Sequence, residues 1–283
     1  MNQDRKISNG MKIVFFGNTK YSLIGARIIH SKLELAFIVT IKNSPVEKFA
    51  VEQKIPFLVA DKFDKAIIQQ IKSLNPGFFV VEDYGLILPR ELLAVPKFAS
   101  INIHHSLLPK YRGPSPAPSA ILNGEKKSGV TIIHMADKID AGDIYAQKEY
   151  ILKPDETTDS LLTELNLMGA QLAILTIKNI YNRNAKRTEQ NEKEATYTSY
   201  MKKSDGFVDV LSPPSEQEID RMIRAYYPWP GVWTRSIINN KLSIIKFLPQ
   251  EKIQVEGKKP MSYKDFINGY EKGKFFLEKL SLI

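Results

Sequence analysis

Short apolar runs alternate with amphipathic stretches over the first 180 residues of the chain. Such apolar runs are typical of strands that are buried on both faces of a sheet. The segments between them carry apolar residues at helical spacing, as in residues 62–74. The expected strands are residues 12–16, 35–41, 55–60, 78–81, 129–135 and 143–151. This alternation predicts an α/β fold with a parallel, doubly wound sheet.

The stretch from 100 to 116 changes character halfway along its length. Its first half alternates as a strand does, so Asn102, His104 and Ser106 point to one face. Its second half is rich in proline and glycine and cannot continue as a strand or helix. An amide and an imidazole therefore leave the end of a strand just before a rigid loop. Open α/β sheets bind ligands at such places.

Three polar residues are the candidates for catalysis: Asn102, His104 and Asp140, the last in an acidic turn between two expected strands. An amide and an imidazolium can donate hydrogen bonds to an oxygen that becomes negative. A carboxylate nearby can hold the imidazole protonated or take up a proton. The set suits attack of an amine on a carbonyl-type carbon. Each residue also has a structural explanation, because Asn102 and His104 could satisfy neighbouring groups and Asp140 could simply form its turn.

Several kinds of site are not expected. The chain has no cysteine, which excludes disulfides and thiol catalysis. His104 and His105 are adjacent on a strand and point apart, so we expect no metal site, and we interpret His105 and His134 as structural. Gly17 follows the first strand without the glycine pattern of a dinucleotide site.

The chain changes composition after residue 181. Residues 182–194 hold a single apolar residue, Ala185, and are typical of a solvated linker. Further on, Ser215 and Glu218 have the spacing of a capping box, and the segment 227–233 is an aromatic turn whose rings pack or, alternatively, stack on bases. We expect a disordered lead-in over 1–10, a first domain over 11–181, a linker over 182–199 and a second domain over 200–283.

Charge and hydropathy limit the partners only loosely. The net charge is +9, spread over both parts of the chain, which permits a polyanionic partner without requiring one. No apolar run reaches the ~18 residues of a membrane span, and the polar N-terminus is not a secretory signal. We expect a cytoplasmic, monomeric protein without a membrane partner.

Eight sequence segments together resemble a known family. NIH followed by SLLPKYRG, then GVTIIHM and IDAGD, is similar to the 10-formyltetrahydrofolate-dependent formyltransferases. Four further segments narrow the resemblance to the methionyl-tRNA formyltransferases: YGLILP, ATYTSYMKK, IRAYYPWPGVW and KKPMSYKDFINGY. The similarity covers nearly the whole chain from Met11.

The resemblance implies a reaction, a site and a fold. It implies formyl transfer from the co-substrate 10-formyltetrahydrofolate to the α-amine of methionyl initiator tRNA. Asn102 and His104 match the residues that hold the oxyanion, and Asp140 the one that assists proton movement. The implied fold is a Rossmann-like domain, the formyltransferase fold, with a small OB-like β-barrel that contacts RNA. The positions matching the folate site are Tyr84, Leu86, Leu88, Ser106, Leu107, Leu108 and Pro109.

The chain also departs from the family pattern. A long basic loop after the second strand is replaced by the short connection from Ile41 to Pro45, and the second domain lacks sequence between 247 and 258, so we expect a shortened barrel. His105 stands where glycine is usual, and Glu82 and Asp83 replace small apolar residues. Two other hypotheses therefore remain: a formyltransferase of a small amine such as a nucleotide-linked amino sugar, and a non-catalytic folate- or RNA-binding protein.

Overall fold

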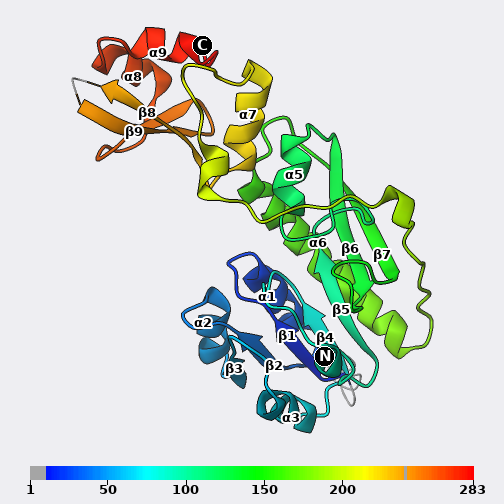
Figure 1. Ribbon diagram of the computed structural model, residues 1–283. Coiled ribbons are helices and arrows are strands. Elements are labelled where there is room, and N and C mark those ends of the chain that lie inside the picture. The colour runs from blue at the N-terminus through cyan, green and yellow to red at the C-terminus, as the bar shows by residue number, and fades with distance from the viewer. Residues whose placement is uncertain (1–10, 239–240) are drawn as a thin grey trace, which may run out of the picture. The chain divides into compact units, whose positions relative to one another are not determined.

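The computed structural model describes residues 11–238 and 241–283, and the chain forms two compact units (Figure 1). Unit 1 comprises the described part of Met1–Pro114 with Lys127–Ile151 and Leu162–Thr198. Unit 2 comprises Ser115–Lys126, Leu152–Leu161 and Ser199–Ile283. The chain thus passes between the units several times, whereas the sequence led us to expect two consecutive domains. The expected lead-in lies outside the described residues.

Unit 1 is built on a seven-stranded sheet in the order β3-β2-β1-β4-β5-β6-β7. The strands from β3 to β5 pair in parallel, which confirms the expected α/β class with a parallel central sheet. The β5–β6 and β6–β7 pairs are antiparallel. A short turn joins β6 directly to β7, which leaves no room for a crossover between these two strands. The strands are β1 (Ile13–Phe16), β2 (Leu35–Thr40), β3 (Phe57–Val59), β4 (Phe78–Val81), β5 (Ala99–His104), β6 (Lys127–His134) and β7 (Ile144–Ile151).

Both faces of this sheet are covered. Alternation along β1 sends Ile13 and Phe15 into one apolar layer and Val14 and Phe16 into the other. The first layer is completed by α1, α2 and α6, and the second by α3 and α4. The near-continuous apolar runs of the sequence are explained by this double burial. The helices are α1 (Ser22–Lys32), α2 (Pro45–Glu52), α3 (Lys65–Ser73), α4 (Arg90–Leu93) and α6 (Thr158–Tyr181).

The sequence predicts that helix α6 buries a stripe of five residues: Leu161, Leu165, Met168, Leu172 and Leu175. The buried face of the helix differs from this stripe at its C-terminal end. Leu161 and Leu165 are buried, but Leu175 is 59% exposed, and Ile174 and Ile177 lie in the core instead. A strict 3.5-residue repeat drifts around a straight helix, so its last member leaves the buried face. By length and composition α6 is also apolar enough to cross a membrane, but 56% of its most apolar window is buried within the protein, as in a core helix.

Unit 2 is a small β domain with helices. Its sheet has the order β11-β10-β9-β8, and among the described residues no pairing closes β11 onto β8. The sheet is therefore open and four-stranded, as the expected shortening of the barrel predicts. However, β10 lies between residues 247 and 258, where we expected strands to be missing. The capping box is present, because Ser215 N donates to Glu218 Oε2 over 2.9 Å. The elements are α5 (Pro116–Leu122), α7 (Glu216–Ala225), β8 (Val232–Ile238), β9 (Lys241–Leu248), β10 (Lys252–Val255), β11 (Met261–Ser262), α8 (Tyr263–Gly269) and α9 (Gly273–Lys279).

The segment after α6 differs from the solvated linker that its composition suggests. The backbones of Thr188 and Ile144 exchange hydrogen bonds of 2.9 and 2.8 Å, so the segment adds to the edge strand β7. Two residues on, the side chain of Gln190 is buried. The polar composition of residues 182–194 predicted a solvated linker. Composition does not show which polar side chains form hydrogen bonds inside the protein, so this prediction missed the buried Gln190.

Two isoleucines of unit 1 offer a matched test of this core. Ile13 is fully buried and Ile87 is 76% exposed. Ile13→Ala should lower the free energy of unfolding by about 2–5 kcal/mol through lost burial and a cavity. Ile87→Ala, the same chemical change, should alter it by no more than about 0.5 kcal/mol. Urea unfolding followed by far-ultraviolet circular dichroism measures both; equal effects would contradict the assigned core.

Candidate active site

The site lies in unit 1, where the end of strand β5 meets the turn between β6 and β7. Asn102 and His104 lie on β5, which pairs with β4 on one side and β6 on the other. Asp140 lies in the turn between β6 and β7, with a φ of 52° in the left-handed region. Asparagine and aspartate tolerate that conformation better than most residues. The topology therefore brings the turn against the end of β5.

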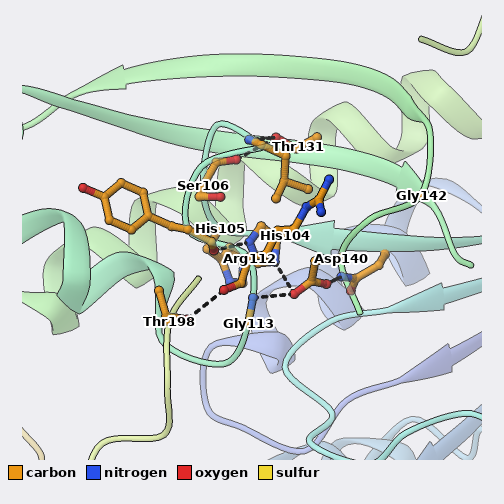
Figure 2. Close-up of polar contacts among 12 residues, drawn as sticks. His104, His105, Ser106, Arg112, Gly113, Thr131, Asp140, Gly142 and Thr198 are labelled. Carbon is orange, nitrogen blue, oxygen red and sulfur yellow. Dashed lines mark hydrogen bonds and ion pairs between the residues drawn. The ribbon is translucent and has the colours of Figure 1, made fainter. Parts of the chain in front are cut away.

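Two of the three predicted residues, Asn102 and His104, converge on the carboxylate of the third, Asp140. Asn102 Nδ2 donates to Asp140 Oδ1 over 3.2 Å, and His104 Nδ1 lies 3.5 Å from Asp140 Oδ2. The backbone N–H of Gly113 donates to the same Oδ2 over 2.8 Å, as Figure 2 shows. Sequence reasoning placed Asn102 and His104 on one face but did not find the Gly113 donor, because a backbone group leaves no signal in the sequence.

The hydrogen bonds of His104 define its tautomer. Its Nε2 lies 2.9 Å from the carbonyl oxygen of Tyr111, which can only accept, so Nε2 carries a proton. Nδ1 then faces the carboxylate of Asp140, 3.5 Å from its Oδ2. Burial lowers the pKa of His104, and Asp140 and the Tyr111 carbonyl oppose that change.

The pair is largely withdrawn from solvent. The side chain of His104 is 6% exposed and that of Asp140 12% exposed. In such a place hydrogen bonds to a developing charge are stronger than in water. Asn102 uses one amide N–H on Asp140, and an amide has two, so the second N–H can serve a reacting oxygen beside the carboxylate.

The comparisons with known proteins agree over most of the chain. The profile of the family described as formyl transferase matches residues 23–177, and that of its C-terminal domain matches 200–253. The methionyl-tRNA formyltransferase of Agathobacter rectalis is 32% identical over 317 residues, covering 94% of this chain and 99% of that protein. This chain belongs to the methionyl-tRNA formyltransferase family.

Other relatives extend the comparison. The methionyl-tRNA formyltransferase of Clostridioides difficile is 38% identical over 237 residues, which cover 79% of this chain and 76% of that protein. The N-formyltransferase of Helicobacter canadensis, solved with folinic acid and dTDP-3-aminofucose, matches with a TM-score of 0.62 and 20% identity over 87% of this chain and 95% of that one. This second likeness shows the fold alone.

The residues that match the folate site of the methionyl-tRNA formyltransferases fall into two groups. Three have half-buried side chains: Leu86, Leu107 and Pro109. The other four are buried: Tyr84, Leu88, Ser106 and Leu108. Their part in folate binding stays a prediction.

Hydrogen bonds hold the loop after β5 against the sheet. Leu108 N donates to Thr131 Oγ1 over 3.1 Å, and Thr131 Oγ1 donates to the Ser106 carbonyl over 2.6 Å. Gln147 Nε2 donates to the Leu108 carbonyl over 2.7 Å. Figure 2 shows Ser106 and Thr131 side by side. The loop that carries Leu107 and Pro109 is therefore fixed from β6 and β7.

A second polar cluster lies on the other side of β5, and we had interpreted its histidine as merely structural. His105 Nδ1 is 3.3 Å from Asp83 Oδ1, and its Nε2 is 3.8 Å from Glu82 Oε1. Thr19 Oγ1 donates to the other oxygen of Asp83. Glu82 fills the space left by Gly25, where a Cβ would lie 1.8 Å from Glu82 Oε2. These are the three positions at which we expected a departure from the family pattern, and the structure places them in one cluster.

Protonation explains how this cluster is tolerated. Burial raises the pKa of Glu82 to about 8, against the opposing effect of His105, so the carboxyl is neutral at pH 7. Burial alone would lower the pKa of His105, but Asp83 and then Glu82 raise it to about 10. The cluster at pH 7 is thus an ion pair of His105 and Asp83 beside an uncharged Glu82. No group of His, Cys, Asp and Glu that could hold a metal is found in the described part of the chain.

The raised pKa of Glu82 predicts a pH-dependent stability. A carboxyl whose folded pKa is raised binds its proton more tightly in the folded state, so its contribution to stability falls as the pH rises from 4.5 to about 8. Glu82→Gln should remove this part of the dependence, which has a slope of up to about 1.4 kcal/mol per pH unit. The free energy of unfolding should therefore favour the variant over the parent increasingly between pH 5 and pH 8.

Glu52→Gln, at an exposed position of α2, is the control and should show no such trend. Urea unfolding at several pH values measures both differences. A difference between Glu82→Gln and the parent that is the same at every pH would contradict the buried neutral carboxyl.

Proposed function

We propose that this chain transfers the formyl group of 10-formyltetrahydrofolate to the α-amine of methionyl initiator tRNA. Membership of the methionyl-tRNA formyltransferase family supports both substrates. The observation that carries the chemistry is the convergence of Asn102, His104 and Gly113 on the carboxylate of Asp140. Together these groups supply donors for a developing oxyanion and an acceptor for a proton.

Asn102 and His104 hold the oxygen of the formyl group as it becomes negative. The second N–H of Asn102 is one donor, and the Nδ1 proton of His104 is the other. The separation of 3.5 Å between His104 Nδ1 and Asp140 is long for a hydrogen bond, so this N–H is the less firmly engaged of the two ring donors. Charge developing on the formyl oxygen favours the imidazolium form that donates to it.

Asp140 takes up the proton that the attacking amine releases. Its carboxylate accepts hydrogen bonds from Asn102 and Gly113, which hold it in place for this role. The amine attacks the formyl carbon directly, so no covalent intermediate with the enzyme is required. The tetrahedral intermediate then breaks its bond to N10 of the folate, and N10 takes the proton from Asp140 as tetrahydrofolate leaves. Folate lies against the half-buried side chains of Leu86, Leu107 and Pro109, over the buried Tyr84, Leu88, Ser106 and Leu108.

The acceptor is the part of this proposal with a competing candidate. Only residues 41–44 separate β2 from α2, and this short connection favours a small amine, such as a nucleotide-linked amino sugar, over RNA. Similarity along the whole length to methionyl-tRNA formyltransferases favours the tRNA. We further propose that residues 200–283 contact the RNA and that the protein acts as a cytoplasmic monomer.

His104 provides the first test of the mechanism. His104→Ala should lower kcat by about 100-fold or more, the scale of losing an oxyanion donor or an acid–base group. His30→Ala, a half-buried histidine of α1 far from β5 in the sequence, is the control and should retain activity. Initial rates at saturating folate measure the change, with circular dichroism to verify folding. Near-normal turnover by His104→Ala would remove His104 from the mechanism.

A competition of acceptors tests the function itself. The protein is given 10-formyltetrahydrofolate with either charged methionyl initiator tRNA or an amino-sugar nucleotide, and the formylated product is identified. We expect formyl-methionyl-tRNA, with an affinity for the tRNA that falls steeply as salt rises, because phosphate contacts release counterions. Formylation of the amino sugar alone, or binding of folate without any turnover, would reject the proposal.

A further inference from the structure

Arg112 is a buried cation whose guanidinium group is fully hydrogen-bonded. It is 1% exposed, and the five N–H groups of a guanidinium all have acceptors here. Nε and Nη2 donate to Gln190 Oε1 over 3.0 and 2.9 Å. Nη1 and Nη2 donate to the two carboxylate oxygens of Glu192 over 3.0 and 2.9 Å, and Nη1 also donates to the Tyr197 hydroxyl over 3.2 Å. A buried charge needs such pairing to be tolerated.

Gln190 connects this cation to the turn that carries Asp140. Its Oε1 accepts from Arg112, and its Nε2 donates to the backbone carbonyls of Asp140 and Gly142 over 2.8 and 2.7 Å. The amide has thus used both N–H groups and its oxygen. The side chain can hold this position only while Arg112 and the turn stay where they are.

The backbone around Arg112 contacts the same pair of catalytic candidates. The carbonyl of Tyr111 faces His104 Nε2, and the N–H of Gly113 donates to Asp140 Oδ2. Arg112 itself is held from behind, since its N–H donates to the Thr196 carbonyl and its carbonyl accepts from Thr198 N, over 2.8 and 2.7 Å. Figure 2 shows Arg112 and Gly113 between Thr198 and Asp140.

We propose that Arg112 and Gln190 are positioning residues that set the separation of Asp140 from His104. We call residues 188–198, which supply Gln190, Glu192, Tyr197 and the backbone partners of Arg112, the strap. The strap holds the turn of Asp140 through Gln190, and it holds the peptides on either side of Arg112 against His104 and Asp140. The kinetic test of this inference rests on the proposed function. A second test, the titration of His104, does not depend on that function.

Two substitutions at Gln190 separate positioning from stability. Gln190→Glu keeps an acceptor for Arg112 but loses both donors to the Asp140 turn. Gln190→Met, of similar length, loses the contacts on both sides. Gln171→Met makes the same chemical change at an exposed position of α6 and is the matched control.

We expect both Gln190 variants to lower kcat by about 10- to 100-fold, since a misplacement of about 1 Å can cost that much. KM for folate should change little, and the Gln171 control should behave as the parent. In an Asp140→Asn background Gln190→Glu should cause little further loss, because residues that act as a unit are not additive. Unchanged kcat in both folded Gln190 variants, or a full additional loss in the Asp140→Asn background, would overturn the inference.

The second readout is the titration of His104 by nuclear magnetic resonance, which needs neither substrate. The chain has only four histidines, so His104→Ala identifies the signals of His104 by difference. The ring faces the carboxylate of Asp140 and the Tyr111 carbonyl, and it also experiences the charges of His105 and Asp83. Since Asp140 raises the pKa of His104, Gln190→Met should lower that pKa as the turn relaxes.

The titration is measured on Gln190→Met, because the new carboxylate of Gln190→Glu would itself affect the ring. An unchanged titration would reject positioning whatever the acceptor proves to be. If the parent protein does not formylate the tRNA, but Gln190→Met shifts the titration of His104, the proposed function is rejected and the positioning role is retained. If Gln190→Met does not fold, Gln190→Glu keeps the test in the kinetic readout.

Discussion

The placement of one carboxylate decides what this protein can do. Asp140 accepts hydrogen bonds from the Asn102 amide and the Gly113 backbone, and its Oδ2 lies 3.5 Å from His104 Nδ1. These partners come from β5 and from the loop that follows it, whereas Asp140 itself lies in the β6–β7 turn. Because these side chains are largely buried, each hydrogen bond to the carboxylate is electrostatically stronger than it would be at the protein surface. The site therefore exists only when three separate segments are packed together.

Buried charge is compensated locally throughout unit 1. Arg112 is neutralised by Glu192, His105 is paired with Asp83, and Glu82 escapes the cost of burial by remaining protonated. An unpaired charge in any of these places would cost several kcal/mol. The three residues at which we expected a departure from the family pattern, Glu82, Asp83 and His105, lie in one cluster, so the charge of His105 is compensated where it is buried.

Much of the fold and part of the site could be predicted from the sequence. Apolar runs and helical spacing located the strands and helices, and period-two alternation placed Asn102 and His104 on one face. Asp140 was identified from its chemistry and from the family resemblance. The strap was missed, because Gln190 lies in a polar stretch that composition alone assigns to solvent. The antiparallel edge of the sheet and the drift of the buried face of α6 were missed as well.

By itself the sequence determined the local elements, the capping box at Ser215 and the chemical groups that were available for catalysis, since these depend on neighbours along the chain. Only the tertiary structure decided that Gln190 reaches across 50 residues to the backbone of Asp140 and across 78 residues to Arg112. Periodicity indicates which way a side chain points from its own strand or helix. It carries no information on how far that side chain lies from a group on another segment, and catalysis depends on that distance.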